Sequence, residues 1–356
     1  MNYSKKPLGE ICKFEYGKSL SDKIRIPGKV NVYGSNGIVG SHTESYTSGK
    51  TIIVGRKGSI GEVEMSNEAC WPIDTTYYID ISCTDCDLDW LAYMLKYLKL
   101  GELNKASGVP GLNRDDAYNK IVTVPELISD QRQIATHIKA QLAEVEKAQK
   151  AVESQVGEIQ NLANAIIYES IRYANTKRHK LGDVLREIKK GIGESWEDYP
   201  VLGATRNGLA LAKEPPGKTP QRYKPVVPGT VFYNPMRILI GSIAFVDDDD
   251  PPGITSPDYV VLQGEEGLLD SRWFYYWLRS PLGEQCISSL ARGAVRERML
   301  FNRLAEGEIE LPEFSIQKKA SESLKELVSI KKVIKQQMDD IKVIPNKLLA
   351  QAFKIE

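Results

Sequence analysis

Several short segments of the sequence combine arginine, lysine, asparagine, serine and glycine, the residue types that contact nucleic-acid bases and phosphates. Arginine can donate two hydrogen bonds to guanine, asparagine can pair with adenine, and glycine lets a backbone approach closely. A turn explains any one segment more simply, but such segments recur at matching places in the two halves of the chain. We therefore predict DNA contacts at Ser35, Asn36, Arg56, Lys57, Lys105, Arg114, Arg206, Asn207, Asn234, Arg237, Arg292 and Arg296. An alternative is that these arginines pair with carboxylates such as Asp258 or Glu297.

The motifs of common enzyme classes are incomplete. Lys50 stands in a Gly-Lys-Thr sequence, but Glu44 replaces the first glycine of a phosphate-binding loop, and the following residues suggest a strand. Residues 233–236 (YNPM) lack the second proline and the aromatic residue of the Asn-Pro-Pro-Tyr motif of amino-methyltransferases. The three histidines are scattered, without metal-binding spacing. We predict no catalytic residue in this chain and no enzymatic activity of its own.

The cysteines and the acidic run do not favour a metal site. Cys83 and Cys86 form a lone C-x-x-C pair, and a four-cysteine site with Cys12 and Cys70 is an alternative to reduced thiols in and around a core. Residues 247–250 (DDDD) are expected to form a solvated turn, because four consecutive carboxylates cannot converge on one ion. We predict no bound metal.

Several sequence patterns occur twice in the same order. Residues 8–11 (LGEI) return at 181–184 (LGDV), residues 58–60 (GSI) at 241–243, and Trp90 at Trp273, and the offsets between copies range from 169 to 187 residues. A repeat of roughly 180 residues is too long for a solenoid and has the size of a domain plus a further element. The chain is therefore expected to be a duplicated domain with a duplicated helix.

Two segments have the seven-residue apolar repeat of a coiled coil. The first, residues 130–175, places Ile138, Val145, Val152, Ile159, Ile166 and Tyr173 on one seam, with Leu142, Gln149, Val156, Ala163 and Ser170 beside them. The second, residues 315–344, uses Ala320, Leu327, Ile334 and Ile341, with Leu324, Lys331 and Met338. Pro345 should kink or end this helix, and residues 346–353 should form a short apolar helical turn.

The preceding segments of each half suggest mixed α and β structure. Residues 51–54 and 76–79 are expected to be strands, and residues 88–100 a helix. The predicted fold class is α+β, with two mixed α/β domains separated by a long antiparallel two-helix coiled-coil rod. The predicted domains are residues 1–128 and 177–314, and the predicted spacer helices are residues 129–176 and 315–356.

Composition and charge limit the class of protein. The chain of 356 residues is 42% hydrophobic and 26% charged, as is usual for soluble proteins, and it carries no secretory signal or membrane-spanning run. We expect a cytoplasmic protein without a membrane partner. The formal net charge is zero, and residues 181–312 carry 15 basic against 19 acidic side chains. Bulk charge therefore does not hold nucleic acid, although local basic loops, or partners that share the phosphate contacts, remain compatible with binding.

The motifs taken together resemble a known family. Residues 32–40 (VYGSNGIVG), 52–61 (IIVGRKGSIG) and 71–78 (WPIDTTYY) are similar to target-recognition domains of type I restriction-modification specificity subunits. Residues 233–237 (YNPMR), 241–243 and 256–261 resemble a second subtype of that domain, and residues 124–125 with 130–135 (DQRQIA) resemble the start of the family's conserved helix. The resemblance covers essentially the whole chain.

The resemblance implies a specificity subunit without catalysis, in which each domain reads one half of a bipartite, asymmetric site in double-stranded DNA and the helices fix the gap. It implies two adenine-methyltransferase (M) subunits as partners, with motor-nuclease (R) subunits joining through the complex. S-adenosylmethionine, ATP and Mg are expected only in these partners, and no cofactor in this chain. The C-terminus departs from the pattern, because Pro345 shortens the second helix. The alternative is a coiled-coil scaffold that organises partner proteins without reading a DNA sequence.

Overall fold

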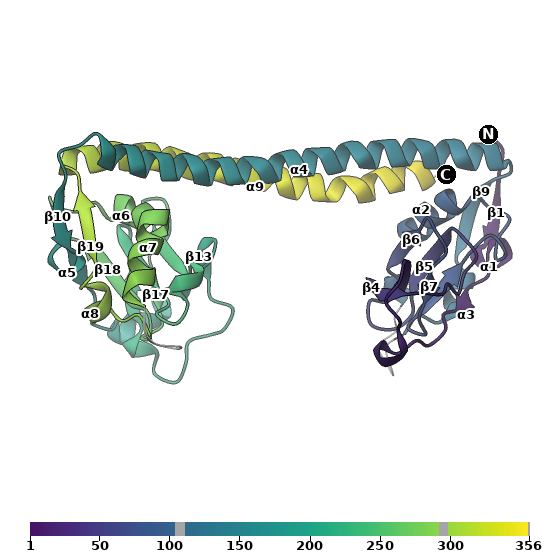
Figure 1. The fold of residues 1–356 in the computed structure, drawn as a ribbon, viewed down its shortest axis with the longest axis horizontal. Coiled ribbons are helices and arrows are strands. Elements are labelled where there is room, and N and C mark those ends of the chain that lie inside the picture. Colours follow the sequence, from purple (N-terminus) through teal and green to yellow (C-terminus); the bar gives the residue numbers. More distant parts are fainter. Residues whose placement is uncertain (104–110, 292–297, 355–356) are drawn as a thin grey trace. The chain divides into compact units, whose positions relative to one another are not determined.

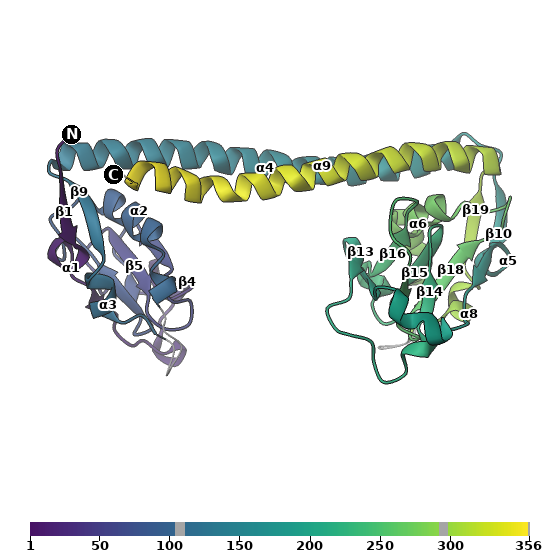
Figure 2. The ribbon, with the colours of Figure 1, turned by 180° about the vertical axis from the view of Figure 1, so that it is seen from behind.

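The computed structural model describes residues 1–103, 111–291 and 298–354. Three predicted contact residues, Lys105, Arg292 and Arg296, lie outside these ranges. The chain divides into two compact units, unit 1 (Met1–Ala151 with Gln337–Glu356) and unit 2 (Val152–Gln336), shown from two sides in Figures 1 and 2. Among the described residues, none of the helices is long and apolar enough to cross a membrane.

Unit 1 is a mixed α/β domain. Its elements are β1 (Tyr3–Pro7), α1 (Leu8–Ile11), β2 (Glu15–Tyr16), β3 (Val30–Gly34), β4 (Gly37–His42), β5 (Thr51–Gly55), β6 (Val63–Ser66), β7 (Trp71–Pro72), β8 (Thr76–Ile79), α2 (Leu88–Leu98), α3 (Arg114–Tyr118) and β9 (Ile121–Pro125), with short 3-10 turns at Asp22–Ile24 and Leu100–Leu103. A four-stranded sheet has the order β2-β8-β5-β6, a three-stranded sheet the order β4-β3-β7, and β1 pairs with β9. Helix α2 packs on β5 and β6.

The predicted strands and helix of unit 1 are confirmed. The apolar run of β5 is buried along its whole length, so Lys50 precedes a central strand and not the helix of a phosphate-binding loop. Asp87 caps α2 by accepting a hydrogen bond from the amide of Trp90, whose side chain is fully buried. The core of the unit lies between this helix and the four-stranded sheet.

Unit 2 repeats this architecture. Its elements are β10 (Lys177–Lys180), α5 (Leu181–Val184), β11 (Leu185–Glu187), β12 (Leu202–Thr205), β13 (Gly208–Leu211), β14 (Lys224–Val226), β15 (Thr230–Tyr233), β16 (Ile243–Val246), β17 (Gly253–Thr255), β18 (Val260–Gly264), α6 (Ser271–Arg279), α7 (Pro281–Leu290), α8 (Phe301–Leu304) and β19 (Glu308–Leu311), with 3-10 turns η3 (Gly193–Asp198), η4 (Pro220–Arg222) and η5 (Ile238–Ile240). The sheet order β11-β18-β15-β16 matches that of unit 1. Asp270 caps α6 as Asp87 caps α2. The duplication predicted from the sequence is therefore present at the level of strand order.

The two long helices are α4 (Ile128–Arg172) and α9 (Phe314–Phe353), and each contributes to both units. In unit 1 the beginning of α4, through Ile138, shares a core with the end of α9, through Phe353. In unit 2 the end of α4, through Ile167, shares a core with the beginning of α9, through Leu324. The helices therefore run antiparallel in each unit, as the teal and yellow ribbons show (Figure 1).

Two residues of the predicted seam lie outside it, and the second long helix continues past Pro345. Pro345 lies inside α9, and residues 346–353 form its last turns, as predicted. The residues after Pro345 stay helical because the ring of Phe353 packs on Trp90 and stacks on Tyr97 of α2. Tyr173 follows the end of α4 and is 73% exposed, and Val156 is 43% exposed, so neither belongs to the buried seam.

Buried glutamines join each long helix to its domain. The side-chain oxygen of Gln131 accepts a hydrogen bond from the amide of Asp87, and its nitrogen donates to the carbonyl of Pro125, at 2.8 and 3.0 Å. Gln317 repeats both contacts, with the amide of Asp270 and the carbonyl of Pro312, each at 2.9 Å. Each glutamine thus connects the capped helix, the last strand and the long helix of its unit.

Candidate nucleic-acid interface

Separate loops of unit 1 meet beside the β3–β4 turn. Ser35 and Asn36 form this turn, and the hydroxyl of Ser59, from the loop after β5, donates to Oδ1 of Asn36 across 3.4 Å. The amide of Leu112 donates to the carbonyl of Arg56 across 2.9 Å, which brings the segment before α3 to the loop after β5. The structure therefore connects the predicted contact residues at 35–36 with Ser59 of the loop that carries Arg56 and Lys57.

The guanidinium groups of Arg56 and Arg114 lie against one ring, that of Tyr16, at 5.3 and 5.5 Å from its centroid. Backbone carbonyls orient both groups. Arg56 donates to the carbonyl of Asp74 through Nε and Nη2, at 3.2 and 2.6 Å, and Arg114 donates to the carbonyl of Phe14 across 3.4 Å. In the part of the chain that the structure describes, neither group forms an ion pair. Because rings and carbonyls orient a guanidinium without neutralising it, this Tyr16 cluster keeps its positive charge.

The neighbouring phenol of Tyr77 adds no negative charge to the Tyr16 cluster. Burial and the neighbouring Tyr16 hydroxyl raise the pKa of Tyr77 to about 12, so this phenol stays protonated at neutral pH. Lys57 is exposed next to the cluster in sequence. Tyr16 is not among the contact residues predicted from the sequence. The exposed fraction of Tyr16, 49%, shows in the structure that its ring is accessible. A tyrosine in a two-residue edge strand has no corresponding signal in the sequence.

In unit 2 the turn between β12 and β13 carries Arg206 and Asn207, and both side chains are exposed. The hydroxyl of Thr205 accepts a hydrogen bond from the amide of Asn207 across 3.2 Å, which orders the turn. The buried hydroxyl of Ser242, just before β16, donates to the carbonyl of Ala204 across 2.6 Å. This bond joins the turn to the β15–β16 connection, where two further predicted contact residues lie.

The β15–β16 connection presents Arg237 to solvent. Oδ1 of Asn234 accepts a hydrogen bond from the amide two residues later, so this side chain shapes the loop. The side chain of Arg237 is exposed and has no hydrogen bond or ion pair among the described residues. Asp258, an alternative partner for the predicted arginines, instead pairs with Arg298 across 3.3 Å. The other considered partner, Glu297, lies outside the described residues.

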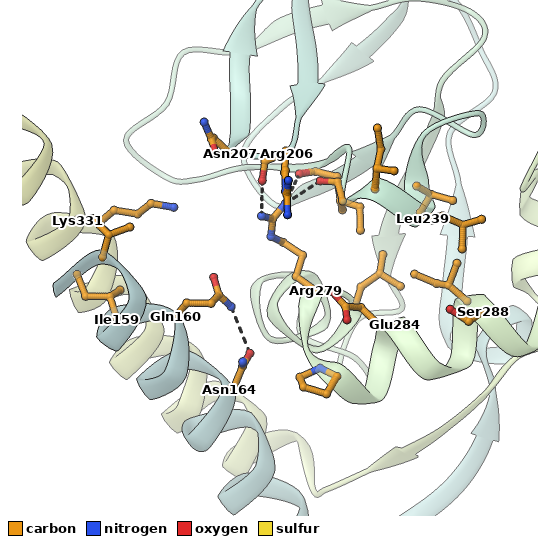
Figure 3. A pocket seen from close by; sticks show the side chains of 18 residues that line it. Ile159, Gln160, Asn164, Arg206, Asn207, Leu239, Arg279, Glu284, Ser288 and Lys331 are labelled. Atoms are coloured by element: carbon orange, nitrogen blue, oxygen red, sulfur yellow. Dashed lines mark hydrogen bonds between the residues drawn. The ribbon is translucent and has the colours of Figure 1, made fainter. Parts of the chain in front are cut away.

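Behind these two loops, unit 2 contains a cavity of about 660 Å³ lined by η5, α7 and parts of α4 and α9 (Figure 3). Arg279 extends into it from the end of α6, and Gln160 donates to Asn164 on the α4 side across 3.2 Å. Lys331 lines the same cavity, and surrounding protein atoms together with the charge of Arg279 lower its pKa. Lys331 was predicted in the helix seam, but its side chain lines this cavity instead. Neither Arg279 nor Lys331 was predicted as a site residue.

The thiols have the properties of core residues. Burial, with a smaller effect of Cys86 and Cys83, raises the pKa of Cys12 to about 12, and burial also raises the pKa of Cys70. Cys70 bonds to Thr47, away from the other three thiols of unit 1. Within residues 1–103, 111–291 and 298–354, no group of histidine, cysteine or carboxylate side chains is arranged to hold a metal ion.

Known proteins are similar to this chain in sequence over residues 2–154 and in fold over its whole length. Residues 2–154 match the family described as the type I restriction modification DNA specificity domain. No curated protein sequence matches the chain significantly. The S subunit of a type I restriction-modification system from M. genitalium is 16% identical, with a TM-score of 0.51, over 100% of this chain and 97% of that chain.

Two further solved structures have the same fold. One, which concerns complex assembly and conformational transition of the type I R-M system, is 14% identical with a TM-score of 0.68, over 99% of this chain and 97% of that chain. The other, the HsdS subunit from Thermoanaerobacter tengcongensis, is 14% identical with a TM-score of 0.50, over 99% and 96%. Residues 2–154 are therefore similar to the type I restriction modification DNA specificity domain, and the chain has over its whole length the fold of these three solved structures.

Proposed function

We propose that this chain is the non-catalytic DNA-recognition subunit of a type I restriction-modification complex. Each unit reads one half of a bipartite site in double-stranded DNA, and the halves differ because the two units carry different loops. One observation carries the proposal. In each unit, loops that are far apart in sequence and carry basic and amide side chains are joined by hydrogen bonds, and the cations Arg56, Arg114 and Arg237 have no carboxylate partner among the described residues.

The same proposal includes protein partners. Several apolar side chains of the long helices are exposed, among them Val156 and Leu162 of α4 and Ile330 and Val333 of α9, and together they support the docking of other helices on these surfaces. We assign this role to two methyltransferase subunits, with motor-nuclease subunits joining through the assembled complex. S-adenosylmethionine, ATP and Mg then act in those partners. A chain of zero net charge also favours partners that share the phosphate contacts. A cytoplasmic location follows from the proposed role.

Methylation by the assembled complex tests the proposal. The chain is purified with a type I methyltransferase subunit, and methylated adenines are mapped on genomic DNA with and without the chain. A split, asymmetric motif that depends on the chain is the expected result. If methylation were absent or had no sequence motif, the scaffold function would be favoured instead.

Arg237 gives a residue-level test of the same function. If its guanidinium forks onto a guanine, Arg237→Ala should cost about 1–3 kcal/mol of binding and relax one base position in one half-site. If it contacts only phosphate, binding should weaken evenly across sequences and depend less on salt. Arg178→Ala is the matched control, because Arg178 is exposed in unit 2 and pairs with Glu308 and Glu310. DNA affinity equal to that of the control would remove Arg237 from the interface.

A further inference from the structure

We propose that Arg279 is the positioning residue that fixes the two DNA-reading loops of unit 2 relative to each other, and so sets the specificity of that unit. The inference rests on the proposed function for its consequence, but the positioning itself is a property of the free chain. Arg279 ends α6, and its guanidinium reaches both the β12–β13 turn and the β15–β16 connection (Figure 3).

The guanidinium of Arg279 donates three hydrogen bonds, one to the β12–β13 turn and two to the β15–β16 connection. Nη2 of Arg279 donates to the carbonyl of Arg206 across 2.7 Å. Nη1 donates to the carbonyls of Gly241 and Ile243, across 3.1 and 3.0 Å. The first carbonyl belongs to a predicted DNA-contact residue, and the other two follow the loop that carries Arg237. One planar group therefore spans both predicted contact segments.

The ring of Tyr275, on the same helix, completes the support of the turn. The guanidinium of Arg279 lies 5.5 Å from the centroid of this ring. Gly208, which follows the turn, has a φ of +101°, and a Cβ added there would lie 3.1 Å from the Tyr275 hydroxyl. The β12–β13 turn therefore packs on Tyr275, and Arg279 donates a hydrogen bond to the carbonyl of Arg206 in the same turn. The cavity of about 660 Å³ borders the same loops, and Arg206, Gly241 and Arg279 all line it.

Only arginine has the donor geometry that this position uses. Its fork presents several N–H groups in fixed directions, whereas a lysine ammonium is a single point that cannot reach carbonyls on both sides at once. A role in phosphate binding would instead depend on charge, which lysine also carries. The bond from Ser242 to the carbonyl of Ala204 joins the same two loops independently. A lysine variant therefore distinguishes the two roles, because lysine keeps the positive charge of Arg279 and loses its donor geometry.

Hydrogen exchange of the free chain measures the positioning without DNA. Arg279→Met and Arg279→Lys should both raise amide exchange in the segments 204–208 and 237–243 by roughly tenfold or more, because losing about 1.4 kcal/mol of local stability is tenfold in an opening equilibrium. Arg178→Met is the control, since it removes an exposed ion pair elsewhere in unit 2. The proposal would be overturned if both segments of Arg279→Met exchanged at the wild-type rate, or if Arg279→Lys kept the wild-type protection.

Methylation by the assembled complex measures the consequence for specificity. Rates are compared on the recognised duplex and on duplexes with single base-pair changes in either half-site. Arg279→Met and Arg279→Lys should each reduce discrimination in one half-site by roughly tenfold and leave the other half-site unchanged. The double variant with Arg279→Met and Ser242→Ala should lose more discrimination than the product of the losses in the two single variants. The reason is that either bond alone still joins the two loops.

The outcomes distinguish this inference from the proposed function. Wild-type discrimination in Arg279→Met, rescue by lysine, or equal loss in both half-sites would each overturn the positioning role while leaving DNA recognition intact. A wild-type complex that methylates without any motif would instead overturn the proposed function, and the exchange experiment would still decide whether Arg279 fixes the loops.

Discussion

Three arginine side chains lie against aromatic rings and bond to backbone carbonyls, so they keep their positive charge. Arg56 and Arg114 share the ring of Tyr16 in unit 1, and Arg279 lies over Tyr275 in unit 2. By contrast, Arg272 of α6 pairs with two carboxylates, Asp247 and Asp248, and serves packing within unit 2. This distinction leaves Arg56 and Arg114 available to a phosphate or a base edge, whereas the hydrogen bonds of Arg279 hold the loops of unit 2.

Tyr16 is expected to support DNA binding through these two guanidinium groups. Tyr16→Ala should weaken binding of the assembled complex by about 1–2 kcal/mol, since each ring–guanidinium contact contributes roughly 0.5–1 kcal/mol at an exposed site. Tyr16→Phe keeps the ring and is the matched control. Fluorescence anisotropy with a labelled duplex measures both variants. Equal affinity of the alanine and phenylalanine variants would contradict this role of the ring.

The buried thiol of Cys12 should make folding stability fall at alkaline pH. Its folded-state pKa is raised from 9.0 to about 12, so the folded state keeps a proton that the unfolded state loses. The stability from this difference is complete below about pH 9 and is lost as the pH rises towards 12. Denaturation at pH 7–11 should therefore show a steeper decline above pH 9 for the wild type than for Cys12→Ala. Parallel curves above pH 9 would show that Cys12 does not contribute.

At the scale of elements, the long helices are joined to the domains by the repeated glutamine contacts. Gln131 and Gln317 are 3% and 0% exposed, and each satisfies a backbone amide and a carbonyl at the same two places of its domain. A buried polar group without a partner is costly, so these contacts fix where each helix leaves its domain. The same elements are thus joined in the same way in both units.

Removing one of these glutamines should destabilise its unit. Gln317→Met leaves the amide of Asp270 and the carbonyls of Leu268 and Pro312 without this partner, which should cost on the order of 3 kcal/mol. Gln337→Met, at an exposed position of the same helix, is the control. Urea denaturation followed by circular dichroism compares them, and coincident transitions of the two variants would refute the prediction.

The length of α4 should set the gap between the half-sites. Four residues inserted after Gly157 lengthen the helix by about 6 Å, close to two base pairs of DNA. The recognised gap should lengthen, or binding should fail, as mapping of methylated adenines will show. Gly157→Ala is the control: an added Cβ meets no atom within 4 Å, so this change should stabilise the helix by about 1 kcal/mol and keep the gap. An unchanged gap after the insertion would exclude the helix as a ruler.

At the scale of the whole molecule, a formal net charge of zero is combined with local basic clusters in both units. Binding strength is therefore expected to come from the assembled complex, and sequence choice from the loops of each unit. The two units share a sheet order but differ in their loop residues, so each should choose its bases independently.

Exchanging one domain should change one half of the recognised motif. If residues 1–125 are replaced by the corresponding domain of another S subunit, the half-site read by unit 1 should change and the half-site read by unit 2 should stay. Adenine methylation mapping measures both halves in one experiment. A change in both halves would mean that the units do not read DNA separately.

The sequence alone determined the duplicated domains, the strands at 51–54 and 76–79, the helix after Asp87 and the two long helices. It could do so because apolar periodicity and capping are local properties of the chain. Only the tertiary structure decided that α9 continues through Pro345, because the packing of Phe353 against α2 is a long-range contact. It also decided the roles of Tyr16 and Arg279, since their partners come from loops distant in sequence and no local pattern records such contacts.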